Sequence, residues 1–246
     1  MRMPDELRQA IAEETERISR AELVRATAEL TEHYRLGNAG SPVKTAAHRA
    51  AYLAVRFPAT LAATENVFAE LHRLAPEVVI GSILDLGAGP GTAMLAAAQV
   101  FPSLREATLV EADPGFIEMG KRLLRAAQPA ECKVLDARWV QHDLRSGLQV
   151  PAHDVVVISY ATGELAQSTA QTVLAQAWNL ARQFLVVLEP GTPRGFGIVH
   201  AARSLLIAER GFILAPCPHQ QACPMSAAGD WCHFSQRVER TSSHRV

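Results

Sequence analysis

From Val78 onward, short apolar runs alternate with helical stretches, and this alternation limits the fold more than any other feature of the chain. Six runs have the length of strands: VVIGSILDLG, ATLVEAD, ARWVQHDL, DVVVISY, FLVVLEPG and FILAP. Strands separated by helices predict a parallel sheet with helices on both faces. The run DVVVISY is apolar almost throughout, as a strand buried on both faces should be. We therefore predict an α/β fold with a doubly wound, Rossmann-like sheet of six strands.

The residues before this alternation have a helical pattern. Ser19 and Glu22 match the S-x-x-E capping box, which predicts a helix that continues to about Tyr34. The loop GNAGSP ends that helix, and two more helices are expected from Lys44 to Arg56 and from Pro58 to Leu74. We predict three parts of the chain: an N-terminal helical region over 1–76, the α/β domain over 77–215, and a cysteine-rich segment over 216–246.

Composition and charge exclude several classes of protein. The chain is 48% hydrophobic, which is enough for a sizeable core, and its net charge of -1 argues against a strong overall field for nucleic acid. We expect no DNA partner. No apolar run is long enough to span a membrane, and the charged start lacks the apolar centre of a signal peptide. We therefore expect no membrane partner and a cytoplasmic location, or the mitochondrial matrix if the source is eukaryotic.

The stretch ILDLGAGPGTA predicts a strand, a glycine-rich turn and the start of a helix. Gly87, Gly89 and Gly91 allow the backbone to turn sharply and to approach a ligand, and the helix offers free N–H groups. The dinucleotide fingerprint G-x-G-x-x-G has its third glycine one position later, where this chain has Thr92. With Asp85 before the turn, the pattern D-x-G-x-G-x-G resembles the first motif of the class I S-adenosylmethionine-dependent methyltransferases. In that family the loop wraps the methionine portion of the cofactor.

Acidic residues follow the next two predicted strands. Glu111 ends the second strand, where a carboxylate can accept hydrogen bonds from both ribose hydroxyls. Asp143 ends the third strand and is a candidate for the adenine amino group, although it can equally belong to a loop pair with His142. The expected cofactor-binding residues are Asp85, Gly87, Ala88, Gly89, Gly91, Thr92, Glu111 and Asp143.

The methyl acceptor of this fold lies beyond the fourth strand. Amino-methyltransferases that modify bases often carry [DNS]-P-P-[YFW] there, whereas this chain has ISYATGEL. Tyr160 and Glu164 are weak candidates for acceptor contacts, and each is as well explained by a structural role. No catalytic residue is identified, so the sequence supports cofactor binding better than turnover.

Three of the four cysteines lie in one short segment near the end of the chain. Cys217, Cys223 and Cys232 have the spacing C-x5-C-x8-C, which is longer than in common zinc and ferredoxin motifs. Thiolates bind iron and zinc alike, so the spacing alone does not name a metal. A loop with three idle thiols is the alternative.

Two C-terminal motifs carry a more specific resemblance. They are L-E-P-G-T-P-R-G-F, which begins at Leu188, and C-P-H-x4-C-P-x7-W-C-H-F-S-Q-R-V-E-R, which begins at Cys217. Together with Y-L-A-V-R-F-P-A-T from Tyr52, they resemble the Rsm family of methyltransferase-like proteins of the mitochondrial small ribosomal subunit and their bacterial relatives. The likeness extends from about residue 30 to the end.

The resemblance implies a class I methyltransferase fold, an S-adenosylmethionine pocket, and a role on the small ribosomal subunit and its rRNA during assembly. It also implies an iron–sulfur cluster on Cys217, Cys223 and Cys232, with zinc as the alternative. The family's fourth cluster cysteine has no counterpart here, so we expect a truncated form; His219, His233 and Cys132 are weak substitutes.

Three functions remain open at this point. The first is a cofactor-binding assembly factor with weak or lost catalysis, and the second is an active rRNA methyltransferase. The third, more distant, is an NAD-dependent oxidoreductase. From Arg194 to the end the chain has six arginines against three acidic residues, a modest excess that favours contact with RNA but also fits a solvated surface.

Overall fold

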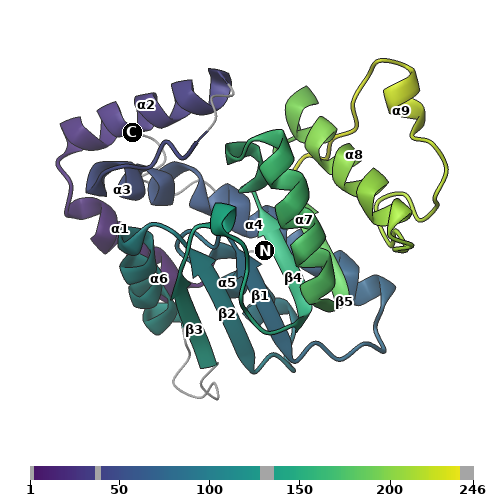
Figure 1. The fold of residues 1–246 in the computed structure, drawn as a ribbon. Helices are drawn as coiled ribbons and strands as arrows, with labels where there is room; N and C mark the ends of the chain where they lie inside the picture. The colour runs from purple at the N-terminus through teal and green to yellow at the C-terminus, as the bar shows by residue number, and fades with distance from the viewer. Residues whose placement is uncertain (1–2, 37–39, 128–135, 239–246) are drawn as a thin grey trace.

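The computed structural model describes residues 3–36, 40–127 and 136–238 and shows an α/β sheet with helical layers on both sides (Figure 1). The four helices of the N-terminal region are α1 (Asp5–Glu16), α2 (Arg20–Leu36), α3 (Ala46–Val55) and α4 (Phe57–Leu74). The predicted capping box is confirmed at the start of α2, because the Ser19 N–H donates to the Glu22 carboxylate at 3.3 Å and the Glu22 N–H donates to the Ser19 hydroxyl at 3.4 Å.

The sheet contains five described strands, all parallel, in the order β3-β2-β1-β4-β5. They are β1 (Ser82–Leu86), β2 (Glu106–Glu111), β3 (Asp136–Gln141), β4 (His153–Ser159) and β5 (Ala181–Leu188). The helices that alternate with them are α5 (Thr92–Val100), α6 (Pro114–Ala127), α7 (Gln167–Leu180) and α8 (Pro193–Ala208). The strand order reverses between β1 and β4, so the crevice at their carboxyl ends is the expected position of a ligand.

Alternate residues of the strands fill two separate hydrophobic layers. Ile83 and Leu109 face the side that carries α5, α6 and the N-terminal helices, whereas Leu84 and Leu86 face the side that carries α7 and α8. Because side chains alternate along a strand, a sheet covered on both faces needs apolar residues at nearly every position. The burial of all five residues of β1 follows from this arrangement.

The N-terminal region packs into the same hydrophobic layer as the sheet. Leu7 and Ile11 of α1 lie in one buried cluster with Leu123 and Leu124 of α6. The Arg122 guanidinium joins the same two helices through two hydrogen bonds to Glu14, at 2.6 and 2.9 Å. The region therefore covers one face of the sheet.

The prediction of a sixth strand is wrong: residues 211–214 are not extended into the sheet, and β5 is its last described strand on that side. Helix α8 ends at Ala208. In the turn that follows, Arg210 has a left-handed conformation (φ 62°) and the Gly211 N–H donates to the Leu206 carbonyl at 2.7 Å. This closing turn directs the chain away from β5, and Phe212 is 90% exposed. A short apolar run followed by prolines fits a surface segment as well as a strand.

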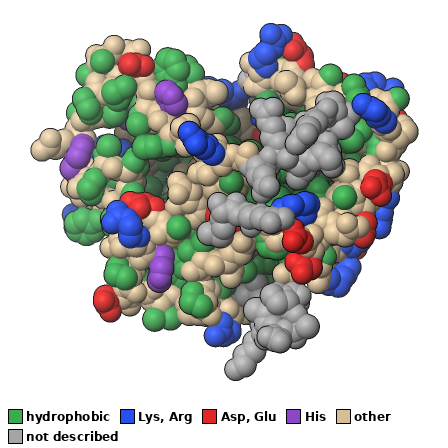
Figure 2. All heavy atoms as spheres, turned by 180° about the vertical axis from the view of Figure 1, so that it is seen from behind, with side chains coloured by type: hydrophobic (Ala, Val, Ile, Leu, Met, Phe, Trp, Pro, Cys, Tyr) green, Lys and Arg blue, Asp and Glu red, His purple; other side chains and the backbone are tan. Residues whose placement is uncertain are grey.

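Residues 211–238 are irregular except for the short helix α9 (Pro224–Ala227). Between the strands and helices lie two 3₁₀ turns, η1 (Leu144–Ser146) and η2 (Thr162–Glu164). Seen from behind, the described surface carries basic and acidic side chains interspersed with apolar ones (Figure 2). No described helix is long and apolar enough to cross a membrane.

Candidate functional site

The glycine-rich turn lies at the carboxyl end of β1, as the sequence indicates. Gly87, Gly89 and Gly91 all have positive φ, at 75°, 54° and 82°. A Cβ atom on Gly87 would lie 2.5 Å from the Cβ of Ala161, at the end of β4, whereas the position of a Cβ on Gly89 is open. The turn thus needs glycine at Gly87 for close packing, and at Gly89 it leaves backbone accessible beside open space.

Glu111 extends from the end of β2 toward this turn. Its carboxylate accepts the Gly89 N–H at 2.7 Å and the Asp113 N–H at 2.8 Å. Burial raises the pKa of Glu111, although these backbone donors act in the opposite direction. A half-buried carboxylate beside a glycine turn is suited to accept ligand hydroxyls.

Asp85 lies under the turn and is almost completely buried, with 1% of its surface exposed. Burial, followed by the nearby negative charge of Glu111, raises the pKa of Asp85 to about 7. Among the residues that the structure describes, the Asp85 Oδ2 atom and the buried Thr92 hydroxyl lack a hydrogen-bond partner. Burial raises the pKa of Tyr52 to about 12, and the nearby Thr60 and Thr92 hydroxyls act against that increase, although Thr92 lacks the geometry of a full hydrogen bond. Orphaned polar atoms in a buried turn are typical of a ligand site.

Two more acidic residues, both half-buried, follow the ends of β4 and β5. Burial and then the charge of Glu111 raise the pKa of Glu164 to about 7, which places Glu164 near the turn. Burial also raises the pKa of Glu189, whose carboxylate accepts the Thr162 hydroxyl and, at 3.1 Å, the Gly163 N–H.

Tyr160, the other weak candidate, has φ of 59° directly after β4. A left-handed conformation is rare for a bulky residue and costs on the order of 1 to 3 kcal/mol. Such strain is found most often at functional sites. The structure therefore brings Tyr160 and Glu164 to the same edge of the sheet as the glycine turn, without identifying an acceptor.

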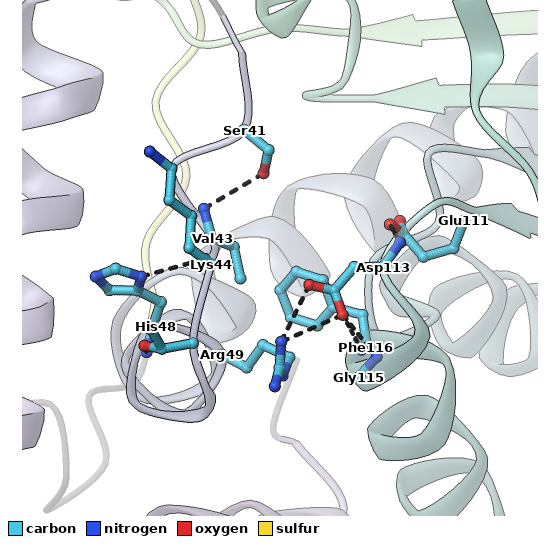
Figure 3. A network of polar contacts seen from close by, with 10 residues as sticks. Ser41, Val43, Lys44, His48, Arg49, Glu111, Asp113, Gly115 and Phe116 are labelled. Carbon is cyan, nitrogen blue, oxygen red and sulfur yellow. Dashed lines mark hydrogen bonds and ion pairs between the residues drawn. The ribbon is translucent and has the colours of Figure 1, made fainter. Parts of the chain in front are cut away.

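Residues of the N-terminal region form a wall of the site that sequence reasoning missed. Arg49 of α3 donates to both oxygens of Asp113, at 3.1 and 3.3 Å, just beyond Glu111 (Figure 3). The Gly40 N–H donates to the Glu164 carbonyl at 2.9 Å, and the Ser41 side chain opposes part of the increase that burial causes in the pKa of the Glu164 carboxyl. The only sequence signal was the motif that begins at Tyr52, which had no assigned role.

Asp143 does not face the turn through a free carboxylate in this structure. It caps η1, and both of its oxygens accept hydrogen bonds from Arg145 at 2.5 to 2.9 Å. These bonds lower the pKa of Asp143. Its contact with an adenine stays a prediction that requires the pair to open.

The three cysteines are free and do not converge. Cys217 and Cys232 are exposed and Cys223 is half-buried. Among the described residues, no group of three histidine, cysteine or acidic side chains is placed to hold a metal ion, and Cys132 lies outside those residues. The arrangement described here therefore does not fit a bound cluster or zinc ion.

The class of fold follows from this geometry. A parallel sheet in the order β3-β2-β1-β4-β5, with a glycine turn after β1 and an acidic residue ending β2, is a Rossmann-like nucleotide-binding fold, which the class I S-adenosylmethionine-dependent methyltransferases share. The chain belongs to the family described as mitochondrial small ribosomal subunit Rsm22, whose model matches residues 46–246.

Named relatives agree with this family. The chain is 28% identical over 196 residues to the human (Homo sapiens) ribosome assembly protein METTL17, mitochondrial, covering 75% of this chain and 42% of that protein. It is 26% identical over 205 residues to Rsm22-cox11 tandem protein 2, mitochondrial, of Schizosaccharomyces pombe, covering 76% and 27%. The chain therefore spans less than half the length of these relatives.

Solved structures resemble the chain more distantly. The mitomycin 7-O-methyltransferase MmcR is 20% identical with a TM-score of 0.47, over 74% of this chain and 55% of that one. The plantazolicin methyltransferase BpumL in complex with SAH is 15% identical with a TM-score of 0.46, over 63% and 65%. The assignment of the fold rests on the strand order and not on these similarities.

Proposed function

We propose that this protein binds S-adenosylmethionine and acts in the assembly of the small ribosomal subunit, with weak or no methyl transfer. The observation that carries the proposal is the junction of the glycine turn with Glu111, where a ligand can replace the contact between the Gly89 N–H and the carboxylate. Family membership supports the ribosomal part of the proposal.

The side chains around the turn fit the chemistry of this cofactor. The ribose hydroxyls are hydrogen-bond donors, which Glu111 can accept. The cofactor also carries an ammonium group and a sulfonium, and the carboxyl groups of the buried Asp85 and the half-buried Glu111 and Glu164 favour such positive charges. When bound, the cofactor supplies an activated methyl group, while the chain supplies binding and orientation.

Calorimetry with purified protein tests cofactor binding. We expect S-adenosylmethionine and its demethylated product to bind and NAD not to bind. Gly89→Val places a branched side chain at a left-handed position beside Glu111 and should abolish binding, while Gly229→Val, in an exposed loop with φ of 69° and open space, should leave it unchanged. Binding of NAD without S-adenosylmethionine would overturn the proposal and favour the oxidoreductase alternative.

The active rRNA methyltransferase is the second candidate, and Glu164 favours it. A carboxyl group with a pKa near 7 suits a general base at neutral pH, and the strained Tyr160 lies four residues before it. Transfer of labelled methyl groups to free nucleosides should be slow or absent. Rapid transfer to a defined rRNA fragment, lost in Tyr160→Phe or Glu164→Gln, would replace the first proposal by the second.

Partners follow from the family. We propose association with the small ribosomal subunit and its rRNA, in the mitochondrial matrix or in a bacterial cytoplasm. Cosedimentation of the purified chain with purified small subunits tests this association, and its dependence on salt reports the number of phosphate contacts. Cosedimentation with the large subunit alone would contradict it.

We retain the hypothesis that Cys217, Cys223 and Cys232 ligate metal, iron–sulfur first and zinc second. The basis is the family resemblance together with thiolate chemistry, and the segment would have to rearrange to bring the thiols together. Its exposed residues have few apolar contacts, so little opposes that movement. Anaerobic purification with iron, sulfide and zinc analysis is the test, and Cys217→Ser should lower the metal content. Absence of both metals would leave an ordinary loop.

A further inference from the structure

Arg56 lies at the junction of α3 and α4 and is a half-buried residue. Its N–H donates to the Tyr52 carbonyl at 2.8 Å and its carbonyl accepts the Thr60 N–H at 3.0 Å, so the junction is held in place by both helices. The guanidinium carbon lies 4.9 Å from the centre of the Tyr34 ring. Throughout residues 3–36, 40–127 and 136–238, the guanidinium has no carboxylate or hydrogen-bond partner.

Other arginines that join the N-terminal region to the sheet domain are paired. Arg49 bonds Asp113, and Arg122 bonds Glu14. Burying part of a guanidinium without an anion costs free energy, and stacking on one aromatic ring offsets only a part of it. An arginine left without an anion next to a ligand site is therefore suited to an anion that the ligand brings.

The surroundings of Arg56 place it on the ligand side of the junction. Burial and then the charge of Glu164 raise the pKa of Tyr34, the ring on which Arg56 stacks, so this ring adjoins the acidic edge of β4. One turn before Arg56, the Tyr52 hydroxyl faces Thr60 and the orphaned Thr92 hydroxyl. Arg56 thus follows by one helical turn a side chain that reaches Thr92, the residue directly after the glycine turn.

We propose that Arg56 binds the α-carboxylate of an amino-acid-bearing adenosyl ligand, which rests on the proposed binding of S-adenosylmethionine. With the ribose at Glu111, the amino-acid end of the ligand extends past the glycine turn toward Thr92 and the junction of α3 and α4. The carboxylate is the only anionic group of this ligand. It enters an edge already occupied by Glu164 and Glu189, so it needs a cation that is not otherwise engaged.

Comparison of S-adenosylmethionine with decarboxylated S-adenosylmethionine isolates this contact, because the two ligands differ only in the carboxylate. We expect the wild-type protein to bind the complete cofactor more tightly. Arg56→Gln should weaken binding of the complete cofactor by roughly 10- to 100-fold and change binding of the decarboxylated one by less than about 3-fold. Arg56→Lys keeps the charge but loses the two-pronged geometry, so it should fall between these values.

Arg73→Gln is the matched control, since Arg73 lies on α4, is exposed and pairs with Glu70. It should leave both affinities unchanged. Urea unfolding of each variant checks the fold, and if Arg56→Gln does not fold, Arg56→Lys carries the comparison. Equal affinity of the wild type for both ligands, or equal losses for both in the Arg56 variants, would overturn the role of Arg56. Failure of the wild type to bind either ligand would overturn the proposed function instead.

Discussion

Asp85 offers a direct test of the electrostatics of the site, because its carboxyl group is buried under the glycine turn with a pKa raised from 3.8 to about 7 by burial and by Glu111. The native state therefore holds a proton that the unfolded chain has already released. Between these two pKa values, stability falls as pH rises, since the native state binds more protons than the unfolded state. Below about pH 4 the two states hold the same proton and this loss is absent.

The size of the effect follows from the difference between 3.8 and about 7, at about 1.36 kcal/mol for each pH unit. Ionised Asp85 thus destabilises the native state by on the order of 4 kcal/mol above pH 7. A small domain has a total stability of only about 5 to 15 kcal/mol, so the effect is large enough to measure. Asp85→Asn removes the titration, while its amide shifts the stability by a constant amount at every pH.

Urea unfolding between about pH 5 and about pH 8 is the appropriate assay. The wild type should lose several kcal/mol more than Asp85→Asn over this range, so that the difference between the two proteins grows with pH. Glu118→Gln is the control, because Glu118 is an exposed acid on α6 and the substitution changes the net charge by the same amount. Parallel pH curves for the wild type and Asp85→Asn would refute the reasoning.

Three other predictions concern packing, binding and the N-terminal region. Gly87→Ala should lower the free energy of unfolding by about 2 to 4 kcal/mol, because residue 87 has a left-handed backbone and the new Cβ would collide with Ala161. Gly229→Ala is equally left-handed but has open space, so it should cost less than half as much. Equal losses of the two variants in urea unfolding would contradict the packing argument. The affinity for S-adenosylmethionine should rise about tenfold from pH 6 to pH 8, because Asp85 and Glu164, whose pKa values are raised to about 7, must release protons to pair with a cation. Calorimetry in two buffers of different ionisation enthalpy should detect that proton release. An affinity that does not depend on pH would rule it out. Glu14→Gln should cost about 1 to 2 kcal/mol in urea by leaving Arg122 without its buried carboxylate, and an unchanged midpoint would show that the pair contributes nothing.

Local patterns account for the parts of the fold that the sequence predicts. The capping box at Ser19, the glycine turn and the alternation of strands and helices each depend on residues close together in the chain. The start of α8 at Pro193 also has a local signal, since Thr192 caps the helix by accepting the Gly195 N–H and proline is favoured in the first turn. The apolar run after Gly211 has no local signal that separates a strand from a loop, because whether it pairs with β5 depends on the direction in which the chain leaves α8.

The features of the candidate site also fall into those that the sequence predicts and those that it does not. Glu111 and the turn lie at the ends of adjacent parallel strands, so their proximity follows from the topology. The wall formed by Arg49 does not, because it depends on a contact across 64 residues that no periodicity reveals. For Asp143, the position after β3 was predicted correctly, but the state of its side chain was not, because Arg145, two residues further on, donates hydrogen bonds to its carboxylate.

The packing of the N-terminal region has a consequence for the order in which the chain can fold during synthesis. The apolar face of α1, with Leu7 and Ile11, packs against α6. Arg122 of α6 pairs with Glu14 of α1, and 108 positions of sequence separate the two residues. At typical elongation rates of about 5 to 20 residues per second, the ribosome needs about 5 to 20 s to make that intervening chain. During this interval the part of α1 that α6 later covers stays exposed to chaperones and proteases, although α3 can already pack on α1. A nascent chain that stalls before α6 is complete should therefore be held or degraded, and not stored as a partly folded domain.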